Sequence, residues 1–161
     1  MALAAAGAHI LCAACDTVRL ENSVTAMVRS GYAAESRVRD QTDLRAHDSV
    51  LGDGAFDIVV NSAGGARHSP TVAASPESFD AVLDLSLRST YSLFACPVRD
   101  MIAAGKPGSF IHISSQMGQV GGVDRAVCWA LLHAPRMIAG GHEQLGPNSA
   151  EPRAGRLAML R

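Results

Sequence analysis

The sequence predicts an α/β fold in which helices cover both faces of one doubly wound parallel sheet, giving three layers. Short apolar runs rich in β-branched residues alternate with longer segments that have a helical period. Residues 56–60, FDIVV, are apolar apart from Asp57, which is typical of a parallel strand buried on both faces. Because strands alternate with helices along the chain, we expect parallel strands joined by right-handed crossovers.

The first part of the chain contains five expected elements. They are the end of a helix at residues 2–6, a strand at 8–14 and a helix at 17–30. A weaker strand at 32–38 and a short helix at 44–51 follow. Asp16 is a good N-cap for the longer helix, and Gly31 ends it. Gly7 suits the C-cap that precedes the first strand.

The second part of the chain continues the alternation. A strand is expected at residues 56–60 and a long helix at 76–104. A second strand at 110–113 and a second helix at 126–132 follow. Ser75 is a good N-cap for the long helix, and Pro76 suits its first position. Pro97 is expected to interrupt or kink that helix, because proline lacks the backbone donor and clashes with the preceding turn.

The character of the chain changes after about Gly140. Residues 141–161 have scattered proline and glycine and little period, which predicts an irregular C-terminal tail. At most one short helix is expected there, near Leu157. The predicted organisation is therefore one α/β domain over residues 1–140, followed by this tail.

The composition argues against several classes of function. The 161 residues include 14 basic and 15 acidic side chains and no basic stripe, so nucleic acid is not an expected partner. Aromatic residues make up 4%, which is few for a base-stacking surface. No apolar stretch is long enough to span a bilayer, and no basic residue precedes the apolar N-terminal run as in a signal peptide. We expect a cytoplasmic protein with no membrane partner.

Cys12 and Cys15 have the spacing of a zinc or dithiol site. One interpretation is half of a zinc site or a redox dithiol, and the other is two small residues on an apolar strand. A zinc site would need a second pair of ligands, and a redox pair normally opens a helix, whereas this pair ends a strand. The sequence therefore favours the second interpretation, and no metal site is predicted.

Two motifs carry the functional information. The turn Asn61–Gly64, NSAG, follows the FDIVV strand, and Ser115 ends the FIHISS strand at a matching distance downstream. Together they resemble the short-chain dehydrogenase/reductase family, in particular a 3-oxoacyl reductase-like member. The resemblance implies a Rossmann-like fold and hydride transfer between the nicotinamide of NAD or NADP and a small-molecule carbonyl or alcohol.

The resemblance also assigns catalytic positions. Ser115 falls on the serine that orients the substrate carbonyl, and Ser86 falls on the asparagine of the proton relay. The general acid/base tyrosine falls on Cys128 and its lysine on Leu132. A thiol can in principle move a proton, but leucine cannot bind a ribose, so activity is expected to be weak or absent. Lys106 is the only lysine in the chain.

For the cofactor, the resemblance assigns four residues. Asp40 falls on the aspartate that contacts adenine, and Asn61 on the asparagine that ties neighbouring strands together. Ala63 and Gly64 fall on the small pair that lets the backbone approach the cofactor ribose. A simple capping role for Asp40 in its turn is equally compatible with the sequence.

Two parts of the family pattern have no counterpart in the sequence: the first strand and the Gly-rich phosphate loop that follows it. Their absence predicts weakened cofactor binding, and it predicts that the strand at residues 8–14 lacks a neighbour on one side. NAD cannot be distinguished from NADP, because the positions that decide are Ala14 and Cys15, which suit neither.

Three hypotheses follow for the function. The first is an oxidoreductase of this family with weak or absent activity. The second is an inactive Rossmann-like module that acts by association, with a homo-oligomer formed through the helix Pro76–Ala104 as its expected assembly. The third is a truncated product without function.

Overall fold

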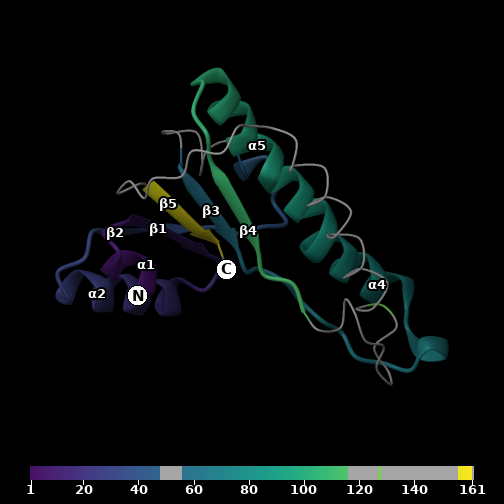
Figure 1. The fold of residues 1–161 in the computed structure, drawn as a ribbon. Coiled ribbons are helices and arrows are strands. Elements are labelled where there is room, and N and C mark those ends of the chain that lie inside the picture. Colours follow the sequence, from purple (N-terminus) through teal and green to yellow (C-terminus); the bar gives the residue numbers. More distant parts are fainter. Residues whose placement is uncertain (48–55, 116–126, 128–155, 161) are drawn as a thin grey trace.

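The computed structural model of the protein describes residues 1–47, 56–115, 127 and 156–160 (Figure 1). Its described strands form one parallel sheet in the order β2-β1-β5-β3-β4. The strands are β1 (His9–Ala14), β2 (Ala34–Val38), β3 (Ile58–Asn61), β4 (Ser109–His112) and β5 (Arg156–Leu160). The helical elements are α1 (Ala2–Ala5), α2 (Thr17–Arg29), the 3-10 turn η1 (Thr71–Ala73), α4 (Pro76–Leu83), the π-helical turn η2 (Asp84–Arg88) and α5 (Ser89–Ala103).

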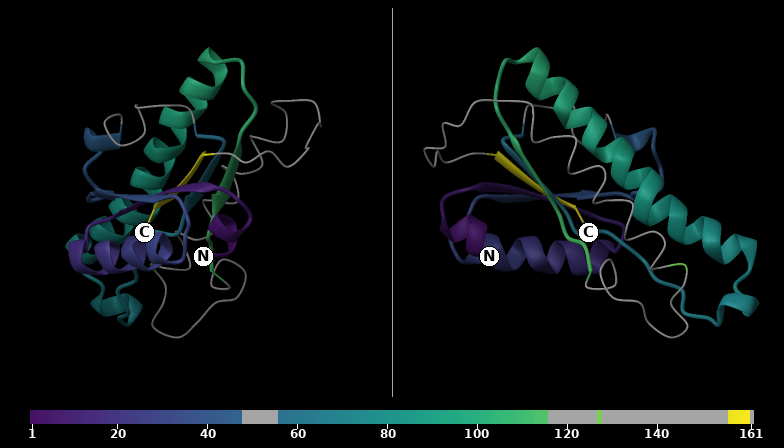
Figure 2. Two further views of the ribbon diagram at one scale, coloured as in Figure 1. Left: turned by 90° about the vertical axis from the view of Figure 1, so that its left-hand side faces the viewer. Right: turned by 45° about the vertical axis from the view of Figure 1, so that its right-hand side comes forward.

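Helices lie on both faces of this sheet, which confirms the predicted doubly wound α/β class. Helices α1 and α2 lie on one side of the strands, and the α4–η2–α5 helix crosses the other side (Figures 1 and 2). Buried residues form one cluster on each face. The cluster toward α5 contains Leu11, Val59 and Leu93, and the cluster toward α1 and α2 contains Ile10 and Leu20, among others.

The central strand β5 is the main correction to the sequence predictions. Residues 156–160 were expected to be irregular or helical, but they form a strand that pairs with β1 on one edge and β3 on the other. The expectation that the strand at residues 8–14 lacks a neighbour on one side is wrong for the same reason. The backbone donors and acceptors along β1 and β3 can pair with an extended segment between them. Such pairing forms a strand even where the segment's own sequence has little strand preference.

The long helix is continuous through Pro97, so the expected interruption there is wrong, and a kink at that residue stays a prediction. Its departure from α-helical geometry lies earlier, in the π-helical turn η2. The predicted caps at its start are confirmed, because Ser75 Oγ accepts a hydrogen bond from the Ser78 backbone N–H at 3.2 Å and Pro76 is the first helical residue. Pi-helical turns inside α-helices are frequent at functional sites.

Two predicted helices fall mainly outside the described residues. Of the short helix predicted at residues 44–51, residues 48–51 are not described. Of the helix predicted at residues 126–132, only Val127 is described, and it is helical. Residues 141–155 of the expected tail also lie outside them, so the domain boundary near residue 140 stays a prediction. No helix among the described residues is both long enough and apolar enough to cross a membrane.

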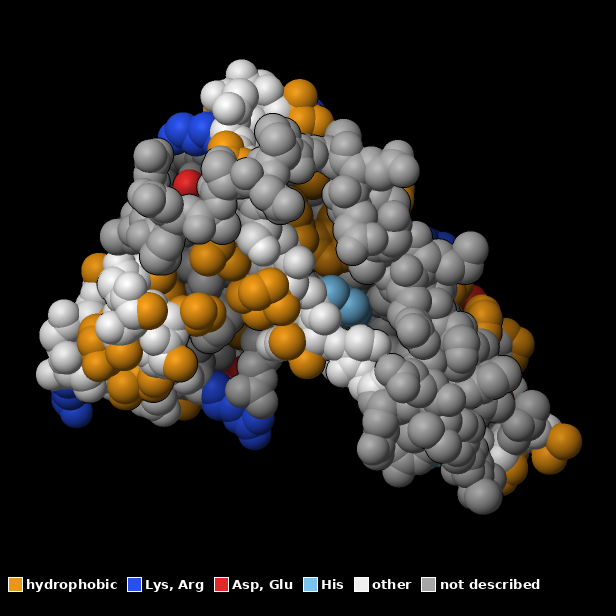
Figure 3. Space-filling view, viewed as in Figure 1, with side chains coloured by type: hydrophobic (Ala, Val, Ile, Leu, Met, Phe, Trp, Pro, Cys, Tyr) orange, Lys and Arg blue, Asp and Glu red, His pale blue; other side chains and the backbone are white. Residues whose placement is uncertain are grey.

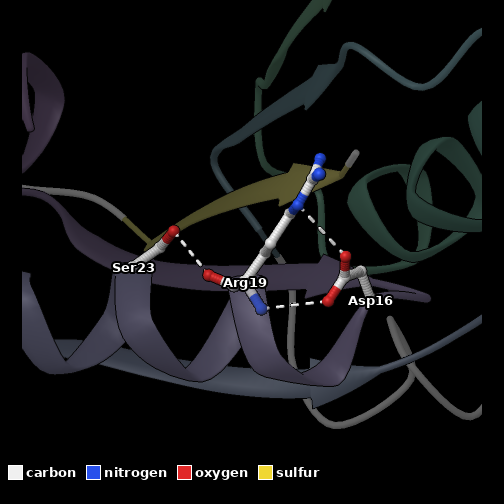
Figure 4. A network of polar contacts seen from close by, with 3 residues as sticks. All are labelled: Asp16, Arg19 and Ser23. Carbon is white, nitrogen blue, oxygen red and sulfur yellow. Dashed lines mark hydrogen bonds and ion pairs between the residues drawn. The ribbon is translucent and has the colours of Figure 1, made fainter.

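The start of α2 shows how the sequence defines a helix end. Asp16 Oδ1 accepts a hydrogen bond from the Arg19 backbone N–H at 3.0 Å, as predicted for an N-cap (Figure 4). Arg19 Nε also lies 3.2 Å from Asp16 Oδ2, and Ser23 Oγ donates to the Arg19 carbonyl at 2.7 Å. The cap satisfies a backbone donor that has no partner within the helix.

Replacing Asp16 with alanine is expected to lower the free energy of unfolding by about 1 kcal/mol, because the helix start loses its side-chain acceptor. Arg19→Gln is the matched control, since it removes the exposed ion pair and keeps the backbone donor. That variant should lose less than about 0.5 kcal/mol. Urea denaturation followed by circular dichroism measures both, and equal losses would assign the stabilisation to the ion pair instead of the cap.

Candidate functional site

The predicted site residues that the structure describes lie after parallel strands, at one edge of the sheet. Asp40 follows β2, the turn Asn61–Gly64 ends and follows β3, and Ser115 follows β4. Because all paired strands are parallel, their carboxyl ends share this edge, where ligands of open α/β sheets bind. Cys128 and Leu132 lie outside the described residues, so their positions relative to Ser115 stay predictions.

Asn61 is completely buried and joins three parts of the fold. Its Nδ2 donates to Thr90 Oγ1 on α5 at 3.1 Å, and its Oδ1 accepts from the Ala63 backbone N–H at 3.1 Å. Its backbone carbonyl accepts from the Ile113 N–H at 2.8 Å, next to β4. The link to the neighbouring strand is therefore made by the main chain, while the amide side chain links β3 to a helix and shapes its own turn.

The turn after β3 packs closely on the π-helical turn. A Cβ added to Gly65 would lie 3.0 Å from Leu85 Cδ2, so a larger residue would require the leucine to move. Ser86 Oγ lies 3.4 Å from both the backbone nitrogen and the carbonyl oxygen of Gly65. The serine at the family's asparagine position thus contacts the backbone of the turn, and Gly64 beside it is exposed.

Three hydroxyls on one helix connect it to the loops at this edge. We call Ser86, Ser89 and Thr90 the hydroxyl row. Ser86 contacts Gly65, Ser89 Oγ accepts from Gln41 Nε2 at 2.9 Å, and Thr90 binds Asn61 as described above. The sequence predictions did not include Ser89 or Thr90. Their spacing of three and four residues from Ser86 places all of them on one helix face, and that spacing is the signal that could have identified them.

Asp40 is exposed and caps its own turn. Its Oδ1 accepts from Thr42 Oγ1 at 2.7 Å and from the Thr42 backbone N–H at 2.8 Å. These hydrogen bonds lower the pKa of the Asp40 carboxyl, so it is ionised at neutral pH. The capping interpretation of Asp40 is confirmed, and contact with adenine stays a prediction that this geometry permits.

Ser115 is exposed beyond the end of β4, as are Ile113 and Ser114 before it. His112, the last residue of β4, is half-buried with its ring centroid 6.2 Å from that of Phe94, and its buried Nδ1 has no hydrogen-bond partner among the described residues. Burial lowers the pKa of His112 and favours the neutral ring. A histidine side chain is visible on the face of the molecule that Figure 3 shows.

The two cysteines with metal-like spacing differ in their environments. Cys12 is buried within β1, and burial raises the pKa of its thiol, whereas Cys15 is exposed just beyond the strand. A residue three positions along a strand points to the opposite face. The geometry accords with two separate small residues on and after a strand, the interpretation that the sequence favoured.

The known proteins that this chain resembles are dehydrogenases and reductases. A family model described as "short chain dehydrogenase" matches residues 1–130. L-xylulose reductase of Mesocricetus auratus is 31% identical over 120 residues, which are 74% of this chain and 48% of that protein. Galactitol 2-dehydrogenase of Agrobacterium fabrum (strain C58) is 32% identical over 125 residues, again 74% of this chain and 48% of that protein. The chain thus spans about half the length of the curated relatives it matches.

Solved structures share the fold. A gluconate 5-dehydrogenase from Burkholderia cenocepacia J2315, in complex with NADP and tartrate, superposes with a TM-score of 0.76 at 28% identity, covering 86% of this chain and 58% of that one. An actinorhodin polyketide ketoreductase with NADPH reaches a TM-score of 0.81 at 20% identity, covering 86% of this chain and 56% of that one, a likeness of fold alone.

Proposed function

This chain belongs to the short-chain dehydrogenase family, and from that premise we propose that its site is the NAD(P)-facing edge of an oxidoreductase with weak or absent hydride-transfer activity. The observation that supports this most directly is the placement of Asp40, Gly64 and Ser115 after parallel strands at one sheet edge. Similarity to a solved relative that contains NADP supports the cofactor class. A bound NAD(P) would supply or accept the hydride.

The described residues fit part of a dinucleotide. The exposed Gly64 leaves the backbone after β3 open to a ribose, and the ionised Asp40 can accept a hydrogen bond from an exocyclic amine. Ser115 can donate its hydroxyl proton to a substrate carbonyl. The described strand ends include no Gly-rich phosphate cradle.

The reason for weak activity is chemical. Cys128 and Leu132 stand where the family has its tyrosine and lysine, and losing a general acid/base costs about 10²–10⁴ in rate. Lys106 cannot substitute for the missing lysine. Lys106 precedes β4, whereas Ser115 follows it. The two residues therefore lie at opposite ends of that strand.

The proposal is tested by restoring the two side chains. We expect Cys128→Tyr with Leu132→Lys to raise the rate of NADPH oxidation with L-xylulose about 10²-fold over the unmodified chain. The rate is measured from the loss of the absorbance of the reduced nicotinamide. Adding Ser115→Ala should remove that gain and leave NADPH binding, measured by fluorescence titration, unchanged. Binding without a gain in rate would refute the assignment of Cys128 and Leu132, and absence of binding would refute the cofactor proposal.

A second candidate function is association with another copy of the chain. The helix α4–η2–α5 carries a shallow groove of about 280 Å³ lined by Leu83, Leu87, Arg88 and Tyr91. Tyr91 is 63% exposed, although its ring is large and mostly apolar. Exposed aromatic and apolar side chains of this kind are enriched where protein surfaces associate. We propose this face of the helix as the contact of a homo-oligomer.

Light scattering tests the association. We expect the unmodified chain to have the mass of a dimer at micromolar concentration and Tyr91→Glu to have that of a monomer, because a buried contact would receive a charge. Val18→Glu is the matched control, since Val18 is 68% exposed on α2, on the other face of the sheet. A monomeric unmodified chain, or equal masses for all three proteins, would refute the interface.

A further inference from the structure

Asp40 lies between two residues that the fold holds in place. The Arg39 backbone N–H donates to the Ala14 carbonyl at 2.8 Å, which holds Arg39 at the end of β1. On the other side of Asp40, the Gln41 side chain is buried and its Nε2 donates to Ser89 Oγ on α5 at 2.9 Å. Asp40 itself is exposed, so its position depends on these neighbours and on the hydrogen bonds within its own turn.

The main chain of Gln41 is held by a second hydrogen bond. His47 is completely buried, and its Nε2 lies 3.0 Å from the Gln41 carbonyl oxygen. Because a carbonyl oxygen only accepts hydrogen bonds, the histidine Nε2–H is the donor. Gln41 is therefore bonded through its carbonyl to its own loop and through its side-chain amide to a helix 48 residues away in the chain.

Ser89 connects this loop to the π-helical turn. The residue is completely buried, and its Oγ also donates to the Leu85 carbonyl in η2 at 2.5 Å. Leu85 lies against the turn after β3, because a Cβ added to Gly65 would be 3.0 Å from Leu85 Cδ2. One buried hydroxyl therefore links the loop that carries Asp40 to the part of the helix that packs on the turn containing Gly64 and Gly65.

We propose that Gln41 and Ser89 are positioning residues for the adenine end of the cofactor. Their hydrogen bond holds the Asp40 loop against α5, so that the Asp40 carboxylate and the turn after β3 face the same dinucleotide. The inference rests on the proposed function, in which Asp40 accepts from the exocyclic amine of adenine. Both partners of the bond are buried, where a hydrogen bond is stronger than in water. Its loss would let the carboxylate move out of reach of the amine, and such small displacements weaken recognition strongly.

Changing the adenine amine tests this role. The hypoxanthine analogue of NADPH has a carbonyl oxygen in place of the exocyclic amine, so that position cannot donate to Asp40. We expect the unmodified chain to bind NADPH about tenfold more tightly than the analogue in fluorescence titrations. Ser89→Ala and Gln41→Leu should each lower this preference to about twofold or less, with little change in the affinity for the analogue. A general loss of stability would weaken the binding of both ligands equally and leave the preference unchanged.

Two further variants separate the possible outcomes. Ser23→Ala removes the same kind of hydroxyl-to-carbonyl hydrogen bond from α2 and should retain the preference, whereas Asp40→Ala should lose it. A preference that is lost in Asp40→Ala but persists in Gln41→Leu would overturn the positioning role and leave the proposed function intact. Gln41→Leu decides this even where Ser89→Ala does not fold, because it keeps the bond from Ser89 to Leu85. A preference that persists in Asp40→Ala, or no binding of NADPH, would refute the proposed cofactor contact and this inference with it.

Discussion

Replacing Ala158 with proline is expected to abolish cooperative folding. Ala158 is the middle residue of β5 and lies opposite Leu11 on β1 and Val59 on β3. Those two partners are fully buried, at 1% and 0% exposure. A residue in a central strand donates its N–H to one of its neighbours, and proline removes that donor at a cost of about 3 kcal/mol or more. The whole free energy of unfolding of a domain of this size is about 5–15 kcal/mol.

The matched control is Ala158→Gly, which keeps the backbone N–H and should lose about 1 kcal/mol. Thermal melts followed by circular dichroism distinguish the two variants. A broad, non-cooperative melt is expected for Ala158→Pro, and a sharp melt at slightly lower temperature for Ala158→Gly. If both variants melt like the unmodified chain, residues 156–160 do not supply the central strand.

Asn61→Leu is expected to lower the free energy of unfolding by about 2–5 kcal/mol. The substitution keeps the approximate shape of the side chain but removes both of its hydrogen bonds. Thr90 Oγ1 and the Ala63 backbone N–H would then lose their partner, and both residues are buried. A buried polar group without a partner costs about 1–3 kcal/mol.

A double-mutant cycle with Thr90→Val identifies the source of that loss. Thr90→Val is nearly isosteric and removes the hydroxyl that accepts from Asn61 Nδ2. Its cost should be smaller in the Asn61→Leu background, because the hydroxyl has already lost its partner there. A coupling energy of about 1 kcal/mol in urea denaturation is the expected result. Additive losses would mean that the amide does not stabilise the fold through Thr90.

The candidate site could be located from the sequence because its motifs follow strands. In parallel sheets the carboxyl ends of strands share one edge, so Asn61–Gly64 and Ser115 could be assigned to that edge from their places after two strands alone. The contacts made there could not be assigned. The amide of Asn61 binds a helix 29 residues away in the chain, and Gln41 binds Ser89 across 48 residues. Such pairs depend on how the layers pack and leave no local pattern.

What the sequence determined by itself is local or periodic. The cap at Asp16, the cap at Ser75 and the strand β3, which begins at Ile58 within the predicted range 56–60, each depend on residues close together in the chain, so propensity and hydrogen bonding within a few residues suffice to specify them. The tertiary structure alone decided the state of residues 156–160 and the burial of Arg39. A strand depends on partners distant in sequence, and the edges of β1 and β3 exist only once the rest of the sheet has formed. For this reason a segment with scant strand preference lies at the centre of the sheet.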